Sequence, residues 1–351
     1  MENAISHHLF SPNLWSQSTL IALGFCVLAF CVSFLVAFLL TRFIKQNFVL
    51  ADSSKTDLVN VDYAPKAGGL GVILGVCVVF VSDLAQGNLG YFLFYMLGGA
   101  VVFLSGFVRD MGFALPSKIC WGLKALGVCL AIVGLDIWLK SLGLGFEIPY
   151  TWGVVFSILV IVGFCNAMSV IDRFNGLSGG FALCVCLSMI SVAISVDMFS
   201  VVNISAILGS AVLGFLALNF PNGKVLLGSG GAYFLGFGLS MILVILTQTS
   251  YSIVSPFYGL CVMIYPLWEM VFVFFREKIL DKKDSVYFHT LLFRRLGNNP
   301  LTSLIILCAQ IPFIALGTLF YADTLALAMT CVVFIFAYTI VYNRLIITQD
   351  S

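Results

Sequence analysis

Charged residues are scarce in this sequence. They make up 9% of its 351 residues, whereas a typical soluble domain carries about 25%. Hydrophobic residues account for 61%, and the mean hydropathy is +1.10. This composition excludes a soluble globular domain and indicates an integral membrane protein. The formal net charge of +1 gives no basic surface of the kind that binds nucleic acid, so no nucleic-acid partner is expected.

Cysteine spacings typical of metal sites or disulfide frameworks are also missing. The eleven cysteines lie in or at the ends of apolar stretches, which is typical of small buried hydrophobic side chains. Cys184 and Cys186 fall within one expected helix, where side chains two residues apart point about 200° from each other, so they do not form a metal clip. The first long apolar run lacks a clear cleavage site and is long enough to span a membrane, which argues against a cleaved signal peptide.

Long apolar runs dominate the chain instead. A bilayer core of about 30 Å is crossed by ~20 apolar residues in a helix, and eleven runs approach or reach this length. They predict an all-α, polytopic helical bundle that forms a single integral membrane domain over residues 1–351. The expected spans are 18–41, 68–84, 90–108, 119–138, 151–171, 178–196, 199–219, 228–248, 252–275, 301–321 and 324–343.

The basic residues predict the orientation of these spans. If the N-terminus lies outside, all Lys and Arg residues fall in inner loops or the inner tail, except Lys140 outside and Lys124 within a span. Because positive residues concentrate on the cytoplasmic side of membrane proteins, we expect an outer N-terminus and a cytoplasmic C-terminus. Residues 276–299 then form a long cytoplasmic loop.

Five stretches on the inner side hold most of the polar residues that a membrane helix does not explain. Glycine turns that lead into helices bind anions, carboxylates and amides suit Mg²⁺, and basic residues attract an anionic lipid head. Together they predict a site for a phosphate-rich ligand on the cytoplasmic face. The stretches are DYAPKAGGLG (62–71), GFVRDMGFALPSK (106–118), NAMSVIDRFNGLSGG (166–180), GKVLLGSGGAYFLGF (223–237) and residues 266–297.

Each of these features also has a structural interpretation. Asp110 or Asp172 alone is equally consistent with an ordinary loop carboxylate. His289 alone is better explained as a solvated loop residue than as a catalytic one. Arg294 and Arg295 are equally explained as anchors at the lipid headgroups. The functional interpretation depends on the convergence of these groups from separate loops.

Glu269 is a separate case, because it lies within an expected span. An ionisable group at that depth is costly, so it is expected to face the bundle interior as a structural residue or a weak site candidate. It is also the one feature that favours a lipid or solute transporter. Against a transporter, the other polar groups gather at one face, whereas transporters bind substrates near the middle of the membrane.

Taken together and in this order, the five stretches resemble the polyprenyl-phosphate N-acetylhexosamine-1-phosphate transferases of glycosyltransferase family 4. NAMSVIDRFNGLSGG is similar to the family's NAxNxIDGxNGLxGG, and GSGGAYFLGF to its GDGGAYFLGF. DSVYFHTLLFRRLG is similar to DxxHLHxLxYRR, GFVRD to GxxDD, and YAPKAGGLG to TPRxGGLG. The resemblance extends from about residue 60 to residue 297.

This resemblance implies transfer of a sugar 1-phosphate from a UDP-sugar to undecaprenyl phosphate, with release of UMP. The reaction would start cell-surface polysaccharide synthesis, including lipopolysaccharide, at the cytoplasmic face of the bacterial inner membrane, with Mg²⁺ on the diphosphate. The oligomeric state stays open between a monomer and a homodimer. Asp110, Asp172 and His289 would be catalytic, with Asp110 and Asp172 also on the metal. Substrate-binding positions would be Lys66, Arg109, Lys118, Asn166, Arg173, Asn175, Ser229, Arg294 and Arg295.

The sequence departs from the family pattern at five positions that carry its working residues. Arg109 replaces the first aspartate of the DD pair, and Ser169 replaces the second asparagine of NxxN. Arg173 replaces a glycine, and Tyr287 replaces the first histidine of HxH. Ser229 replaces an aspartate that the family uses as a magnesium ligand. Because a hydroxyl is a poor substitute for a carboxylate on a hard cation, weak metal binding is expected.

Two hypotheses follow from these departures. In one, Arg109 and Arg173 neutralise the diphosphate without Mg²⁺, because guanidinium groups bind phosphates in a bidentate manner. In the other, catalysis is lost, and the protein binds a lipid phosphate or nucleotide sugar, or supports a paralogue. Turnover of a UDP-sugar in excess EDTA tests the first hypothesis.

Overall fold

The computed structural model describes residues 19–43, 64–85, 89–249, 252–278 and 286–350. Within these ranges the chain is helical apart from turns and one isolated bridge between Ser141 and Glu147, which confirms the all-α prediction. The helices are α3 (Thr19–Phe43), α4 (Gly68–Ala85), α5 (Leu89–Asp110), α6 (Ser117–Leu135), α7 (Tyr150–Ile171), α8 (Leu177–Ser195), α9 (Phe199–Asn219), α10 (Gly228–Gln248), α11 (Phe257–Val262), α12 (Ile264–Lys278), α13 (Phe288–Leu296), α14 (Asn299–Leu319) and α15 (Thr324–Asp350).

Ten of the eleven expected spans each correspond to one of these helices. The span expected at 252–275 is instead divided at Met263 into α11 and α12. Pro266 lies in the first turn of α12 and has no N–H to donate to the carbonyl four residues earlier, so it favours a helix start here. In the described part of the chain, nine helices are long and apolar enough to cross a membrane. The count of eleven and the orientation stay predictions.

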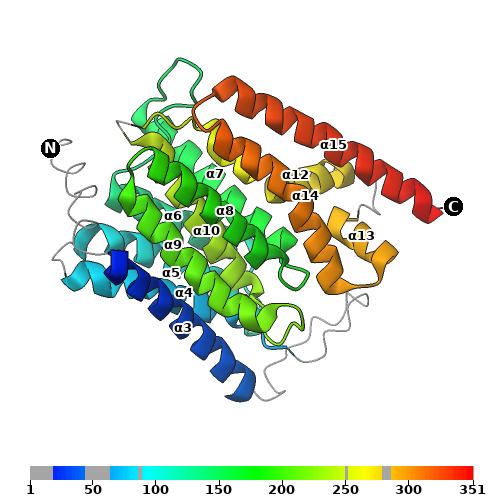
Figure 1. Ribbon diagram of the computed structural model, residues 1–351, viewed down its shortest axis with the longest axis horizontal. Coiled ribbons are helices and arrows are strands. Elements are labelled where there is room, and N and C mark those ends of the chain that lie inside the picture. Colours follow the sequence, from blue (N-terminus) through cyan, green and yellow to red (C-terminus); the bar gives the residue numbers. More distant parts are fainter. Residues whose placement is uncertain (1–18, 44–63, 86–88, 250–251, 279–285, 351) are drawn as a thin grey trace.

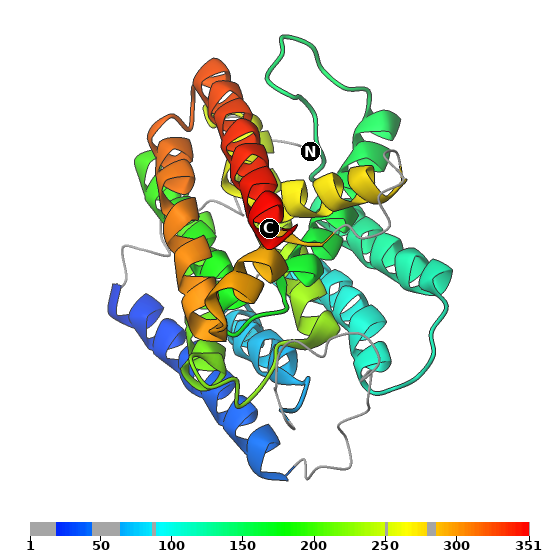
Figure 2. The same cartoon turned by 90° about the vertical axis from the view of Figure 1, so that its right-hand side faces the viewer.

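Helix α10 is the central element of the bundle (Figures 1 and 2). Its apolar window is 94% buried, whereas that of α3 is 17% buried, and α10 packs against α4, α5, α7, α8, α9 and α11. Small residues allow this crowding. A Cβ at Gly236, for example, would lie 2.6 Å from the carbonyl oxygen of Phe164 on α7. Because α10 contacts so many helices, its N-terminal end is held in place from several sides.

Five helix ends meet on one face of the bundle. These are the C-terminal ends of α5, α7 and α9 and the N-terminal ends of α4 and α10, as hydrogen bonds between them show. The nitrogens of Gly68 and Gly69 donate to the carbonyls of Leu226 and Leu227 at 2.8 and 2.9 Å, and Leu226 donates back to Pro65 at 3.0 Å. The turn before α4 and the turn before α10 therefore form one backbone unit, although nearly half the chain separates them.

Candidate functional site

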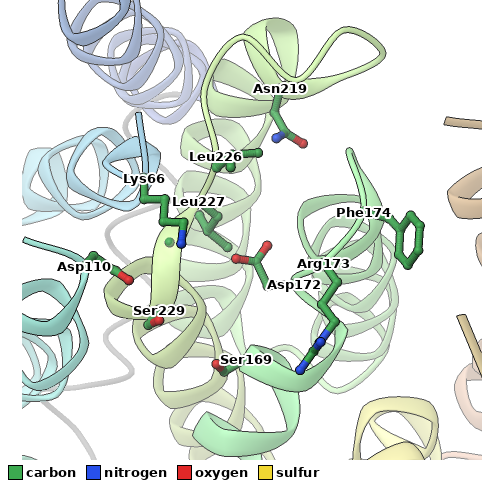
Figure 3. Close-up of a pocket in the computed structure, with 11 residues that line it drawn as sticks. Lys66, Asp110, Ser169, Asp172, Arg173, Phe174, Asn219, Leu226, Leu227 and Ser229 are labelled. Atoms are coloured by element: carbon green, nitrogen blue, oxygen red, sulfur yellow. The ribbon is translucent and has the colours of Figure 1, made fainter. Parts of the chain in front are cut away.

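A pocket opens where these helix ends meet (Figure 3). Its empty volume, which includes the part open to solvent, is about 600 Å³. Four of the five polar stretches identified in the sequence contribute to it. The lining residues are Lys66, Asp110, Ser169, Asp172, Arg173, Phe174, Asn219, Leu226, Leu227, Gly228 and Ser229.

The glycines that begin α10 are explained by packing of the protein against itself. Gly228 has φ +79°, a left-handed conformation that glycine adopts readily. A Cβ there would lie 2.6 Å from the carbonyl oxygen of Lys66 and 2.8 Å from Oδ2 of Asp110. A Cβ at Gly230 would lie 2.8 Å from the nitrogen of Phe107. The glycine turn that was expected to bind an anion therefore accommodates neighbouring backbone and the Asp110 carboxylate.

Asp110 ends α5 and caps the start of α10. Its Oδ2 accepts a hydrogen bond from the nitrogen of Gly230 at 3.0 Å, and the Ser229 hydroxyl bonds to the same carboxylate. A carboxylate at a helix N-terminus is stabilised by the free N–H groups there. Ser229, which replaces a family aspartate, thus gives Asp110 a hydrogen-bond donor where a second carboxylate would repel it.

Asp172 immediately follows α7 and lies on the opposite side of the pocket. The Ser178 hydroxyl donates to its Oδ1 at 2.5 Å. Burial raises the pKa of Asp172 to about 7, against the smaller lowering effects of Ser178 and Lys66. Near neutral pH this carboxyl group is therefore divided between its charged and neutral forms, and it can release or take up a proton in the pocket.

Two cations share the pocket with these carboxylates. The Lys66 ammonium points into the space between Asp110 and Asp172 (Figure 3) and interacts electrostatically with both. The Arg173 guanidinium lies 4.9 Å from the ring centroid of Tyr287, the first residue before α13. With both carboxylates ionised, the charges of the lining residues cancel.

The described residues do not fit the Mg²⁺ that the family resemblance implies. They contain no group of three His, Cys, Asp or Glu side chains placed to hold a metal ion. Asp110 and Asp172 already accept hydrogen bonds from neighbouring groups. The Lys66 ammonium points into the space between them. A divalent cation would compete with that ammonium without a third carboxylate to attract it.

Comparison with known proteins supports the family assignment. Residues 92–247 match the model of glycosyl transferase family 4. An undecaprenyl-phosphate alpha-N-acetylglucosaminyl 1-phosphate transferase from Thermotoga maritima is 26% identical over 79% of this chain and 84% of its own. A decaprenyl-phosphate N-acetylglucosaminephosphotransferase from Mycobacterium tuberculosis is 25% identical over 74% of this chain and 72% of its own.

A phospho-N-acetylmuramoyl-pentapeptide-transferase from Leuconostoc mesenteroides is 26% identical over 57% of this chain and 60% of its own. The chain is therefore similar to glycosyltransferase family 4 over residues 92–247. Lys66 precedes the region that the family model matches, whereas Asp110, Asp172 and Ser229 lie within it.

Two asparagines that were expected to bind substrate hold other parts of the protein. Asn166 accepts a hydrogen bond from the Lys124 ammonium and donates to the carbonyl of Val162 at 2.7 Å. Asn175 is buried, and its Nδ2 donates to the carbonyl of Pro221 at 3.0 Å. Neither residue lines the pocket, and their substrate-binding role stays a prediction.

His289, expected to be catalytic, is buried with 0% exposure beside Glu269. Its Nδ1 lies 3.2 Å from Oε1 of Glu269, and its ring contacts those of Phe174 and Tyr287. It does not line the pocket and touches it through Phe174. The catalytic role of His289 stays a prediction.

Glu269 joins three helices at this point. Its Oε1 accepts from the nitrogen of Phe288 at 2.7 Å, and its Oε2 accepts from the Tyr338 hydroxyl at 2.7 Å. It is fully buried on α12, between the start of α13 and α15. The expectation that this side chain faces the interior is confirmed, and its contacts make it an anchor for α13.

Four further cations expected to bind substrate lie outside the pocket. Arg109 and Lys118 are exposed at the end of α5 and the start of α6. Arg294 and Arg295 are exposed in the last turn of α13. Their position near the pocket face allows a role in attracting a lipid head, which stays a prediction.

Asn219, which was not predicted as a site residue, lines the pocket at the end of α9. Its Oδ1 accepts from the nitrogen of Gly176 at 2.7 Å, and its Nδ2 donates to the carbonyl of Val225 at 2.8 Å. It therefore joins the loop after α7 to the turn before α10. An amide at the end of an apolar run, two residues before Pro221, was the available signal in the sequence.

Proposed function

We propose that this protein transfers a sugar 1-phosphate from a UDP-sugar to a polyprenyl phosphate. The relatives named above are polyprenyl-phosphate N-acetylglucosamine-1-phosphate transferases and a phospho-N-acetylmuramoyl-pentapeptide transferase. The observation that carries the proposal is the convergence of four distant stretches on one pocket of carboxylates, cations and hydroxyls at the ends of apolar helices. Such a pocket lies where a water-soluble nucleotide and a lipid phosphate can meet.

In phosphoryl transfer of this kind, the protein contributes mainly positioning of the reactants and neutralisation of their charge. An acceptor phosphate oxygen attacks the phosphorus that carries the sugar, a new P–O bond forms, and the bond to the UMP oxygen breaks. The acceptor is a phosphate monoester with a second pKa of about 6, so most of it is already deprotonated at pH 7. Lys66 and Arg173 line the pocket and would neutralise part of the negative charge. A protonated Asp172, whose pKa is about 7, can donate to the leaving UMP.

The proposal places this reaction on the cytoplasmic side of a bacterial inner membrane, as the first step of a cell-surface polysaccharide. Its support is the distribution of Lys and Arg along the sequence, together with the gathering of the polar stretches at one end of the helices. The UDP-sugar donor follows from the motif resemblance, and the sugar itself is left to experiment.

The test is a transfer assay with the full chain in detergent or nanodiscs. A panel of UDP-N-acetylhexosamines and undecaprenyl phosphate is supplied, and both UMP and lipid-linked sugar are measured, with Mg²⁺ or with EDTA. We expect both products, and their loss in Asp172→Asn. Asp136→Asn is the matched control, because Asp136 ends α6 on the opposite face with φ 54°, a conformation that asparagine tolerates. No product from any sugar in either condition would contradict the proposal.

A second candidate is binding without transfer. It is favoured by Ser229, whose hydroxyl bonds to Asp110 where the family places a carboxylate. In that case a UDP-sugar or lipid phosphate would raise the unfolding temperature of the protein while UMP release stays at background. The two readouts of the assay separate these functions.

A further inference from the structure

We propose that the pocket holds the diphosphate of its ligand with side-chain cations, without a divalent metal, and that buried Lys124 supplies part of the charge. This inference rests on the proposed function and specifies how that site binds its ligand. The bound group is a diphosphate or phosphate ester, and protein side chains neutralise its charge.

The positive and negative charges of the lining residues are balanced. Lys66 and Arg173 contribute two positive charges, against Asp110 and Asp172. Lys66 points between the carboxylates, and Arg173 lies on the far side of Asp172. A pocket in which cations balance carboxylates gives little attraction to a divalent cation. It does offer two separate positive groups to an anion with two or more charges.

Both carboxylates accept hydrogen bonds from the protein itself. Gly230 and Ser229 donate to Asp110, and Ser178 donates to Asp172. Hydrogen bonds from protein donors therefore fix the position of each carboxylate. Asp110 in particular ties α5 to α10, which gives it a structural role that needs no metal.

Lys124 is a third cation near the pocket, and it is enclosed by the helical bundle. It lies on α6 with 1% exposure. Its ammonium donates to Oδ1 of Asn166 and lies 4.1 Å from the ring centroid of Tyr233 and 4.9 Å from that of Trp121. An amide oxygen and two aromatic faces stabilise an ammonium, but none of them carries a full negative charge.

The counter-charge of Lys124 is missing from the described part of the chain. The single ion pair found there joins His289 and Glu269, and the charged groups that act on Lys124 include Arg109 but no carboxylate. A buried ammonium without a counter-ion is costly. An anionic ligand in the pocket would supply that charge and lower the cost.

A short chain of contacts connects Lys124 to the pocket. The ring beneath its ammonium belongs to Tyr233, whose hydroxyl bonds to the side chain of Ser169. Ser169 lines the pocket, and Ser229 lies one helical turn before Tyr233 on α10. Lys124 therefore lies behind the wall formed by the two serines, where its field reaches the ligand through little water.

The first experiment measures ligand binding to the full chain in excess EDTA and in Mg²⁺. The probes are UDP-N-acetylglucosamine, UMP and undecaprenyl phosphate, tested separately by thermal shift and calorimetry, so that a nucleotide and a lipid phosphate are distinguished. We expect the UDP-sugar to bind in EDTA with an affinity within about threefold of that in Mg²⁺.

The outcomes separate this inference from the proposed function. Binding of the UDP-sugar that requires Mg²⁺ would overturn the inference and leave the function standing. Binding in EDTA without UMP release from any donor would support the inference and contradict transfer. Binding of undecaprenyl phosphate alone in EDTA would overturn the assignment to a nucleotide diphosphate.

The second experiment replaces each cation by an apolar residue of similar length. We expect Lys66→Met and Arg173→Met each to weaken UDP-sugar binding in EDTA by about tenfold or more, as loss of a charged hydrogen-bonding partner does. Lys140→Met and Arg42→Met are matched controls, because Lys140 contacts Trp138 on the opposite face and Arg42 contacts Phe38 at the end of α3. Both controls are expected to bind normally.

Lys124→Met is expected to raise the unfolding temperature of the ligand-free protein or leave it unchanged, and to weaken binding by about threefold to tenfold. Lys124→Arg keeps the charge and is expected to restore most of the affinity, which a purely structural role of the lysine would not explain. Salt dependence gives a further readout, since the affinity of the Met variant should fall less steeply with ionic strength. Unchanged affinity in a folded Lys124→Met protein would overturn the role of Lys124.

Discussion

The backbone nitrogen of Gly230 lies 3.0 Å from Oδ2 of Asp110 and donates a hydrogen bond to it. This bond joins the first turn of α10 to the last residue of α5, which are 120 residues apart in the sequence. The pocket thus has a wall whose shape depends on a carboxylate that also lines the pocket. Substitutions at this junction are expected to affect folding and binding in different ways, and matched variants can separate the two.

Gly69→Ala is expected to destabilise the protein. Its new Cβ would lie 2.6 Å from the nitrogen of Gly231 on α10, and backbone cannot move aside as a flexible side chain does. Overpacking of this kind costs about 1–3 kcal/mol, so the unfolding temperature in detergent should fall. Gly163→Ala on α7 is the control, because nothing lies within 4 Å of its Cβ position and alanine favours a helix by about 1 kcal/mol. Equal unfolding temperatures for the two variants would contradict this packing.

Ser229→Asp is expected to make ligand binding depend on Mg²⁺. A carboxylate at this position would face Asp110 and repel it, and a divalent cation would relieve the repulsion. Without metal, the variant should bind a UDP-sugar about tenfold more weakly than the natural chain, and Mg²⁺ should restore binding. Ser229→Asn is the matched neutral control and should show no metal response. Calorimetric titration of Mg²⁺ into each protein checks the prediction, and no metal binding by the aspartate variant would refute it.

Binding of a UDP-sugar is expected to weaken as the pH rises from 6 to 8. Burial raises the pKa of Asp172 from its ordinary value of 3.8 to about 7. Below pH 7 the carboxyl group is mostly neutral, whereas above it a negative charge faces the diphosphate, whose own charge is constant in this range. The loss of affinity should be about threefold and should disappear in Asp172→Asn. An affinity that instead rises with pH would indicate a bound metal cation.

The same pKa shift predicts a pH dependence of stability. Because the folded protein binds the Asp172 proton more tightly than the unfolded chain does, this group favours folding at low pH. Its contribution is lost as the pH rises from about 4 to 7. The unfolding temperature of the natural chain should therefore fall relative to that of Asp172→Asn across this interval, as parallel thermal scans would show.

Glu269→Leu is expected to release α13 from the bundle. The substitution leaves the nitrogen of Phe288 and the hydroxyl of Tyr338 without their buried acceptor, at a cost of about 3 kcal/mol. Tyr338→Phe removes one of these bonds and should cost about 1 kcal/mol. Thr339→Val on the same helix is the control, since its hydroxyl bonds only within α15, to Ile335.

The readout for these three variants is hydrogen exchange of the amides in 288–296. Exchange should accelerate most in Glu269→Leu, less in Tyr338→Phe and not at all in the threonine variant. Unchanged protection of α13 in the glutamate variant would show that this helix is held by other contacts.

Much of the fold follows from local pattern. Ten of the eleven apolar runs each form one helix, as expected because backbone groups inside a membrane must be paired within the helix. The division of the 252–275 run was not predictable from proline alone. Pro266 lies at the start of α12, whereas Pro312 lies inside an unbroken α14. Which proline ends a helix depends on the packing of neighbouring helices, and a single sequence does not contain that information.

The candidate site was predictable where the motif residue itself lines the pocket. Asp110, Asp172, Ser229 and Lys66 come together as the motifs indicate. The partners of Asn175 could not be predicted, because its role depends on Pro221, 46 residues away. A residue type suited to binding phosphate is equally suited to holding a loop, and only the distant partner decides between the two.

The pairing of Gly68 and Gly69 with Leu226 and Leu227 sets an order for biogenesis. Lys66 leaves the ribosome early, but the turn that positions it is made only after α5 to α9 have been synthesised. Until then these two nitrogens, in the first turn of α4, lack the acceptors that the turn before α10 provides. Insertion of the earlier helices can proceed during translation, but the pocket itself is completed only when α10 arrives.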